Sequence, residues 1–399
     1  MADIAFLVKK FPKSSETFIK NQVSGLVEKG HNVDVYSQYR PGESVDEDSP
    51  DVDVTYLESI GFVDEAISLF TVQFGEVLSH PSLLSLFAEH DTGSANQKNL
   101  WKRRAEPLLK NISQYDAIHA HYGPVGNGFQ FLQQYTDATF VTSFYGYDAS
   151  ELLQKNPWRY YDLFEAADVI TSLSTDMDET LQEHGCAASK IERLPLPVDI
   201  SSFDFSQSNY TQGEPIQLLS VCRLVEKKGL RYALDAVSRL HEEFDIQYEI
   251  AGDGPLRDEL EKQMKQLGIE DVVEFSGWKT SEEVAELMAG ADIFIQPSVV
   301  SSAGDKEGTP TVLLEAQARG LPVVSTYHAG IPEIVEDGSS GYLVPERNVD
   351  ELTRVLESLL SDPSTWPQFG RNGRQFVEDT HSLRAVATTL ERIYGVSST

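Results

Sequence analysis

Positive charge is scarce in this chain. Its 399 residues include 32 lysines and arginines against 63 aspartates and glutamates, which gives a formal net charge of −31 at pH 7. So negative a protein repels the phosphate backbone of nucleic acids, which argues against nucleic-acid binding. The excess acid indicates either simple solubility or adaptation to a salty cytoplasm. We favour the second, because molar salt shortens the Debye length to about 3 Å and weakens self-repulsion.

Cysteine and long apolar segments are also scarce. The two cysteines, Cys186 and Cys222, fit a reducing compartment and are too few to form a metal site alone. No apolar run approaches about 18 residues, and the run at residues 5–8 is too short for a secretory signal. We therefore expect a cytoplasmic protein that does not span the membrane.

Short β-rich runs alternate with helical patterns, which is typical of a doubly wound α/β fold. The runs form two groups, at residues 4–8, 33–36, 117–121, 139–144 and 169–173, and at residues 216–221, 248–251, 272–275, 293–296, 323–325 and 341–344. The polar stretch 199–213 between the groups lacks periodicity and indicates a linker. We expect two Rossmann-like domains facing each other across a cleft, at residues 1–200 and 214–380, followed by a final helical segment at 381–399.

Residues 59–110 interrupt the alternation and indicate an insertion of helices. Its end carries a basic cluster with one aromatic residue: Lys98, Trp101, Lys102, Arg103, Arg104 and Lys110. One interpretation is a solvated helix face. The other is that residues 98–110 dock on a membrane or on a lipid-linked acceptor at its cytoplasmic face.

The segment from Glu307 to Glu315 follows a strand and a loop, and it opens a helix. Thr309 suits the N-cap and Pro310 the first helical position. Free backbone N–H groups at the positive end of the helix dipole would then form an anion pocket: those of Gly308, Thr309, Thr311 and Val312. A phosphate flanked by two hydroxyl-accepting carboxylates is what a nucleotide sugar needs.

Two cations follow the run at residues 216–221. Arg223 and Lys228 lie in a loop at the carboxyl end of this strand, where ligands of open α/β sheets bind. In isolation such side chains are usually solvated. Beside the Glu307 pocket they predict neutralisation of a diphosphate.

Glycines and an aromatic residue mark the next two strand ends. Gly252 and Gly254, in Gly-Asp-Gly-Pro, either make a tight strand-to-helix turn or let the backbone approach a nucleotide closely. Trp278 either flanks a base or packs in the core.

In this order the motifs resemble the retaining glycosyltransferases of the GT-B class called family 4. Four landmarks match: Arg223 with Lys228-Gly229, the turn at residues 252–255, the strand end at residues 275–278, and the spaced pair Glu307 and Glu315. The segments 297–308 and 11–19 resemble its exopolysaccharide branch, of the colanic-acid type. The likeness spans nearly the whole chain and is weakest over residues 59–110.

The resemblance implies a role for each matched position. Arg223 and Lys228 would hold the diphosphate of a nucleotide-sugar donor, Glu307 would contact the sugar near its reacting carbon, and Glu315 would contact the ribose. The amides of residues 308–312 would complete the phosphate cradle, and no metal or other cofactor would be needed. The last helix, at residues 383–394, would cross back onto the N-terminal domain.

Two histidines of the first half also match the family. His119 and His121 lie on one face of a strand by alternation, and no third metal ligand has a diagnostic spacing. The run His-Ala-His-Tyr-Gly resembles a strand end of the family, which implies that one histidine lines the cleft and the other is structural. His121 lies nearer the loop and is the better candidate.

One position departs from the family pattern. Family members commonly carry His in a Phe-His-Gly-x-Asp segment that faces the sugar, and here Tyr145 takes its place. Tyrosine can hydrogen-bond a sugar hydroxyl, but its pKa near 10 makes it a poorer proton shuttle at neutral pH.

We therefore expect a retaining hexosyltransferase that uses a nucleotide-diphosphate sugar and a glycan or lipid-linked glycan acceptor. One alternative is a nucleotide-sugar epimerase of the same architecture. Another is a non-catalytic nucleotide-sugar-binding partner of an active transferase, which only Tyr145 supports.

Overall fold

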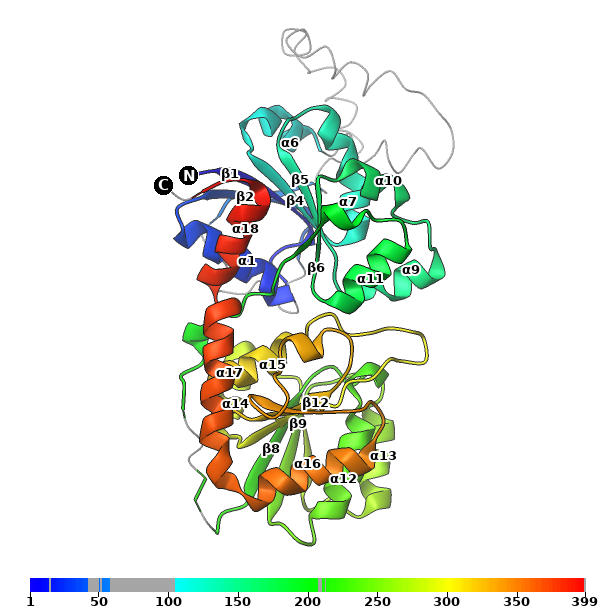
Figure 1. Ribbon diagram of the computed structural model, residues 1–399, viewed down its shortest axis with the longest axis vertical. Coiled ribbons are helices and arrows are strands. Elements are labelled where there is room, and N and C mark those ends of the chain that lie inside the picture. The colour runs from blue at the N-terminus through cyan, green and yellow to red at the C-terminus, as the bar shows by residue number, and fades with distance from the viewer. Residues whose placement is uncertain are drawn as a thin grey trace.

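The computed structural model describes residues 1–13, 16–41, 50, 52–57, 105–206, 210–211 and 213–397. Two parallel β-sheets within these residues are each covered by helices on both faces (Figure 1). The first sheet contains β1 (Asp3–Lys10), β2 (Asn32–Tyr39), β3 (Val54–Tyr56), β4 (Ala117–His121), β5 (Thr139–Ser143), β6 (Val169–Ser172) and β7 (Ile191–Arg193). The second contains β8 (Ile216–Val221), β9 (Ile246–Ala251), β10 (Val273–Gly277), β11 (Ile293–Ile295), β12 (Val323–Thr326) and β13 (Gly341–Val344).

Both sheets are wound in the same way. Their strand orders are β3-β2-β1-β4-β5-β6-β7 and β10-β9-β8-β11-β12-β13, so the winding reverses beside β1 in the first sheet and beside β8 in the second. Ligands of such sheets bind outside the carboxyl ends of the strands at these switch points. The doubly wound α/β class expected from the sequence is confirmed.

Helices connect the strands. Those of the first half are α1 (Thr17–Glu28), α6 (Glu106–Asn111), α7 (Gly123–Phe129), α8 (Gly146–Ala149), α9 (Glu151–Lys155), α10 (Tyr161–Ala166) and α11 (Thr175–Glu183). Those of the second half are α12 (Leu230–Leu240), α13 (Arg257–Leu267), α14 (Ser281–Gly290), α15 (Thr311–Arg319), α16 (Val349–Ser361), α17 (Trp366–Thr380) and α18 (Leu383–Tyr394). The helices expected over residues 59–110 and most of the basic cluster lie outside the described residues. Lys110, at the end of α6, pairs with Glu106 at 3.2 Å.

Alternating strand residues form the cores. On β1, Ala5 and Leu7 face the layer of α6, α7 and α10, whereas Ile4, Phe6 and Val8 face α1 and α18. A strand that is buried on both faces is a continuous apolar run, which is why the runs were visible in the sequence.

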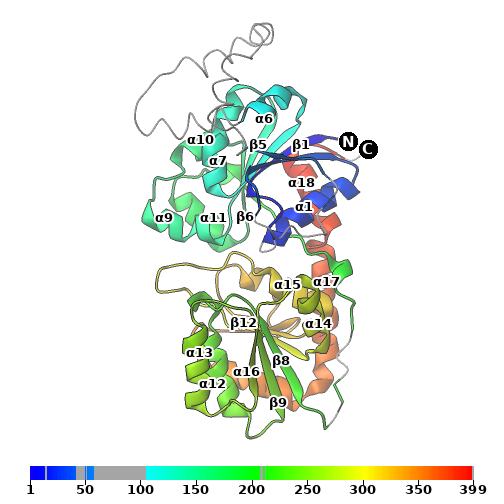
Figure 2. The same ribbon diagram turned by 180° about the vertical axis from the view of Figure 1, so that it is seen from behind.

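The last two helices join the halves of the molecule. In Figures 1 and 2, α17 runs along the second sheet and α18 continues onto the first, so that both chain ends lie beside the first sheet. Helix α18 packs on α1, where Gly25 leaves room for the Leu383 carbonyl, because a Cβ there would lie 2.7 Å from that oxygen. Glu391 pairs with Lys29 and also lies 2.8 Å from the Nε2 atom of His31.

Candidate functional site

The site is built around an ion pair between two strand ends. Lys228 ends the 3₁₀ turn Glu226–Lys228 after β8, and Glu307 lies in the loop after β11. The Lys228 Nζ atom is 2.7 Å from the Glu307 Oε1 atom, with side chains 13% and 7% exposed. Burial alone would raise the pKa of Glu307, but the ammonium groups of Lys228 and Lys227 outweigh it and hold that pKa below its ordinary value. Glu307 is therefore ionised at neutral pH.

The chain fixes this pair by packing the 3₁₀ turn against the loop. Gly229 has a φ of +67°, and a Cβ there would lie 1.8 Å from the Pro297 carbonyl oxygen. Lys227 donates at 3.1 Å to both the Asp305 Oδ1 atom and the Lys306 carbonyl. These contacts hold the segment that carries Lys228 beside the segment that carries Glu307.

Helix α15 begins four residues after Glu307, and no side chain caps its N-terminus. It starts at Thr311 with Pro310 at the N-cap, so the expected cap at Thr309 is wrong by one residue, because Pro310 keeps an extended ψ of 103°. No side chain caps the helix and its first turn contains no acidic residue. Its unpaired N–H groups and positive dipole end therefore lie beside the ion pair, in an arrangement suited to a phosphate.

Glu315 lies just over one turn inside α15. Its carboxylate is partly buried and hydrogen-bonded to the Thr311 side chain. Burial raises its pKa to about 7, against the opposing effect of Thr311. The two glutamates of the spaced pair thus differ in charge state near neutral pH.

Arg223 belongs to the same group of charged residues as Lys228 and Glu307. Its side chain is exposed, and the neighbouring Cys222 thiol interacts electrostatically with Lys228, Glu307 and Arg223. Burial raises the pKa of Cys222 to about 12, although the two cations oppose it. The structure thus brings together the expected cations and Glu307.

The glycines of the Gly-Asp-Gly-Pro turn are required by the protein's own packing. A Cβ on Gly252, where φ is +135°, would lie 1.9 Å from the Cys222 carbonyl oxygen, and one on Gly254 would lie 2.6 Å from that of Leu224. Their contact with a nucleotide remains a prediction. Trp278 is 68% exposed, which excludes the alternative of a core aromatic.

The first sheet contributes a buried histidine pair. The rings of His119 and His121 stack with centroids 4.3 Å apart, as alternation predicted. His119 bonds to the Tyr394 hydroxyl of α18 and the Ser143 hydroxyl, each at 2.7 Å, and burial lowers its pKa to about 3. It is a structural residue. The His121 Nδ1 atom lies 2.8 Å from the Tyr145 hydroxyl, and its Nε2 atom has no partner among the described residues.

Tyr145 is held at the start of α8. Its backbone N–H donates to the Asp148 Oδ1 atom at 2.7 Å, while the Oδ2 atom accepts from the Gly123 N–H at 2.6 Å. Burial raises the pKa of Asp148 to about 7 and that of Tyr145 well above its usual 10. The phenol therefore stays protonated at neutral pH.

The two halves of the site meet across the gap between the sheets. A Cβ on Gly146 would lie 2.7 Å from the Gly308 nitrogen, so the start of α8 touches the Glu307 loop. The Lys306 Nζ atom is 2.7 Å from the Asp176 Oδ1 atom of α11, and the Thr175 N–H donates to the Glu333 carboxylate at 2.6 Å. The segments that carry Tyr145 and Glu307, expected in different domains, are thus in contact.

Sequence reasoning missed several polar residues of this region. Lys227, His328 and Glu346 are examples, and each follows a strand end as Arg223 does. A polar residue shortly after a buried strand was therefore the sequence signal that could have identified them. Among the described residues, no group of three or more histidine, cysteine or acidic side chains is placed to hold a metal ion, and no helix has the length and apolar character to cross a membrane.

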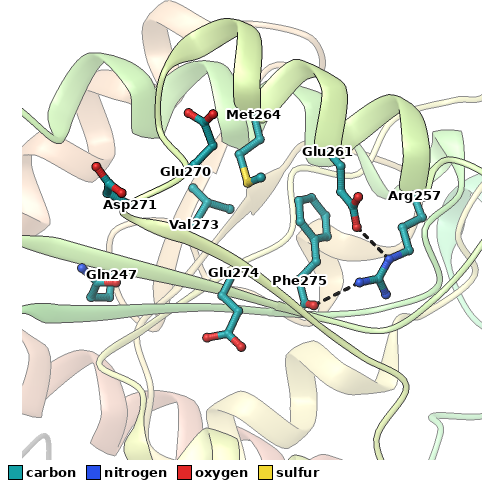
Figure 3. Close-up of a pocket in the computed structure, with 9 residues that line it drawn as sticks. All are labelled: Gln247, Arg257, Glu261, Met264, Glu270, Asp271, Val273, Glu274 and Phe275. Carbon is teal, nitrogen blue, oxygen red and sulfur yellow. Dashed lines mark hydrogen bonds and ion pairs between the residues drawn. The ribbon is translucent and has the colours of Figure 1, made fainter.

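A separate hollow of 370 Å³ lies beside the edge strand β10, away from this site. Figure 3 shows that Arg257 of α13 spans between Glu261 and the Phe275 carbonyl. Acidic side chains line much of the hollow, and nothing in it corresponds to the ion pair and helix terminus described above.

Comparison with known proteins agrees with this geometry. The chain matches the family described as Glycosyltransferase Family 4 over residues 15–202 and the one described as Glycosyl transferases group 1 over residues 202–376. The putative colanic acid biosynthesis glycosyltransferase WcaL of Salmonella typhimurium is 32% identical over 403 residues, covering 96% of this chain and 97% of that protein. The amylovoran biosynthesis glycosyltransferase AmsK of Erwinia amylovora is 30% identical over 367 residues, with 88% and 89% covered.

The fold has solved counterparts. HepE of Anabaena, determined in complex with UDP and glucose, superposes with a TM-score of 0.74 at 17% identity, covering 99% of this chain and 100% of that one. Two Rossmann-like sheets facing each other, with a final helix returning to the first, define the GT-B architecture. The chain belongs to the family 4 glycosyltransferases of this architecture, as its resemblance to the colanic-acid-type branch predicted.

Proposed function

We propose that this glycosyltransferase moves a hexose from a nucleotide-diphosphate sugar to a glycan or lipid-linked glycan acceptor, with retention of configuration and without a metal ion. The names of WcaL and AmsK support a place in cell-surface polysaccharide synthesis. Such donors are cytoplasmic metabolites, so we assign the reaction to the cytoplasm. A membrane contact through residues 98–110 stays a proposal.

The single observation that carries the proposal is the Lys228–Glu307 pair beside the uncapped start of α15. When the bond between the sugar and the diphosphate breaks, negative charge grows on the diphosphate. This charge is stabilised by fixed positive groups: Lys228, Arg223 and the N-terminus of α15. In other transferases a metal ion stabilises the same charge. Glu307 orients the sugar, and the acceptor hydroxyl attacks from the face that the diphosphate leaves.

The test is transfer itself. The full chain is incubated with UDP-, GDP- and ADP-hexoses, with and without a polyprenyl-diphosphate-linked glycan, in the presence and absence of EDTA. We expect acceptor-dependent release of one nucleoside diphosphate, insensitive to EDTA, and a product whose anomeric proton coupling matches that of the donor. Conversion of the donor sugar without an acceptor would instead identify an epimerase, and donor binding without turnover would identify a non-catalytic partner.

A further inference from the structure

The segments that follow three neighbouring strands of the second sheet carry polar side chains that lie close together. Strands β11, β12 and β13 are paired in that order, and the segments after them carry Glu307, His328 and Glu346. His328 is 1% exposed, so its imidazole is buried between the other two segments. Most buried polar atoms have hydrogen-bond partners, and both nitrogens of His328 have one.

The partners define the position of the imidazole proton. The Glu307 backbone N–H donates to the His328 Nε2 atom at 3.0 Å, which requires a lone pair on Nε2. The proton of the neutral ring therefore resides on Nδ1, and this N–H donates to the Glu346 Oε1 atom at 2.6 Å. Glu346 selects the tautomer that can hold the Glu307 backbone.

The same carboxylate also holds the start of the loop that ends at Glu307. The Glu346 Oε2 atom accepts from the Val300 N–H at 2.9 Å. Arg347 contacts Glu346 at 3.3 Å and donates to the Val300 carbonyl. Glu346 therefore holds both ends of the segment from Val300 to Glu307. It binds the Val300 N–H directly, and it holds the Glu307 N–H through the His328 imidazole.

We propose that His328 and Glu346 are positioning residues that fix the Glu307 backbone, so that the Glu307 carboxylate stays against Lys228 and aimed at the reacting sugar. The inference rests on the proposed function of Glu307. In this proposal the two residues act through the Glu307 backbone and not by contacting the donor. Their effect should fall on kcat more than on the donor KM, because Lys228, Arg223 and α15 bind the diphosphate whereas Glu307 aligns the sugar. A misplacement of about 1 Å can cost on the order of 100-fold in rate.

The chain supplies a matched control with the same chemistry elsewhere. The Ala2 N–H donates to the His31 Nδ1 atom at 3.2 Å, and the His31 Nε2 atom lies 2.8 Å from the Glu391 Oε1 atom. His31 is 3% exposed and lies at the amino end of β2, remote from the carboxyl strand ends. Loss of this bond reports only the structural cost of removing a buried histidine.

The experiment compares His328→Leu, His328→Gln, Glu346→Gln and His31→Leu by steady-state kinetics. Binding of UDP, GDP and ADP and the unfolding midpoints are measured alongside. We expect His328→Leu to lower kcat about 100-fold while the donor KM changes less than threefold. His328→Gln, whose amide oxygen can accept the Glu307 N–H, should recover most of kcat. His31→Leu should lower the unfolding midpoint by a similar amount and leave kcat within twofold. If His328→Leu does not fold, His328→Gln and Glu346→Gln are compared with wild type instead. We expect Glu346→Gln to have a kcat about tenfold below that of wild type.

A second readout does not depend on turnover. In protein with ¹⁵N-labelled histidine, the resonance assigned by its loss in His328→Gln should show a protonated Nδ1 and an unprotonated Nε2, and Glu346→Gln should mix the two tautomers. A proton on Nε2, or equal kcat values in His328→Leu and His31→Leu, would overturn the inference. If the wild type transfers no sugar from any donor, the proposed function is overturned instead. The tautomer of His328 would still show whether its Nε2 atom accepts the Glu307 N–H.

Discussion

The Tyr145 hydroxyl lies 2.8 Å from the His121 Nδ1 atom, at the position where the family commonly has a histidine. Burial raises the pKa of Tyr145 well above 10 and lowers that of His121 well below 6.5, so both groups are neutral at physiological pH. Tyr145 can thus donate a hydrogen bond to a sugar hydroxyl, but it cannot act there as an anionic base.

Removing this hydroxyl should slow the reaction without abolishing it. We expect Tyr145→Phe to lower kcat about tenfold, which corresponds to one neutral hydrogen bond of about 1.4 kcal/mol, and Tyr145→His to remain active. Tyr36→Phe is the control, because it removes a buried hydroxyl bonded to Tyr115 at 2.8 Å, at a site distant from Glu307. A wild type that binds donor without turnover, together with an active Tyr145→His, would show that this chain is a non-catalytic partner.

Glu315 should couple donor binding to protons. Its pKa of about 7 in the free protein means that it is largely protonated at pH 6 and largely ionised at pH 8. Ribose hydroxyls bind best to the ionised carboxylate, so binding should lower this pKa, release protons below pH 7 and tighten as the pH rises from 6 to 8.

The measurement is calorimetry of nucleoside diphosphate binding at pH 6, in two buffers with different ionisation enthalpies. Glu315→Gln should remove most of the buffer-dependent heat, because Asp148, the other carboxyl among the described residues with a raised pKa, is present in both proteins. Equal proton release by the wild type and Glu315→Gln would contradict this role.

Single residues were predictable where a motif placed them at a strand end. Arg223, Lys228 and Glu307 were selected in this way, and the structure brings them together around Cys222, while their contact with a donor stays a prediction. His328 and Glu346 were missed although they occupy equivalent positions. Their role depends on how the loops after the consecutive strands β11, β12 and β13 pack against one another, which no local sequence pattern encodes.

At the scale of elements, buried strands and amphipathic helices were predicted closely. Strands β4, β8 and β13 and helix α18 have the expected bounds. The edge strands β3 and β7 were missed because three partly buried residues each give no distinct pattern. The predicted start of α15 differs from the observed start by one residue, because a proline suits either side of a helix boundary.

The contact between α8 and the Glu307 loop should be necessary for catalysis. In Gly146→Ala the new Cβ would lie 2.7 Å from the Gly308 nitrogen and would keep the two sheets apart. We expect kcat to fall more than tenfold, the unfolding midpoint to change little and the radius of gyration in solution scattering to increase. Gly128→Ala in α7 is the matched control, because a Cβ there meets nothing within 4 Å. Equal kcat values in the two variants would refute the closure contact.

At the scale of the whole molecule, the sequence predicted two domains and a crossing final helix, but not how closely the domains approach. The ion pair of Lys306 with Asp176 and the bond of Thr175 to Glu333 join residues more than 100 positions apart. Such contacts depend on the relative placement of two folded units. Periodicity and spacing within each unit carry no information about it.

The charge of the molecule leads to a prediction about salt. With a net charge of −31, repulsion between acidic groups should destabilise the folded state at low ionic strength. We expect the unfolding midpoint to rise by several degrees between 0.1 M and 2 M KCl, a salt without the strong exclusion effect of sulfate. An unchanged or falling midpoint would favour simple solubility as the reason for the acidic composition.

The most direct test of the central claim, a donor diphosphate held by Lys228 and the start of α15, is thermal unfolding against a panel of nucleoside diphosphates. Binding to the native state alone raises the midpoint, and saturation at about 100 times Kd stabilises by roughly 2.7 kcal/mol. We expect one diphosphate to give a clear rise in the wild type and in Lys262→Ala, an exposed-lysine control on α13, and none in Lys228→Ala. No rise with any diphosphate in folded wild type, or an equal rise in Lys228→Ala, would contradict the account.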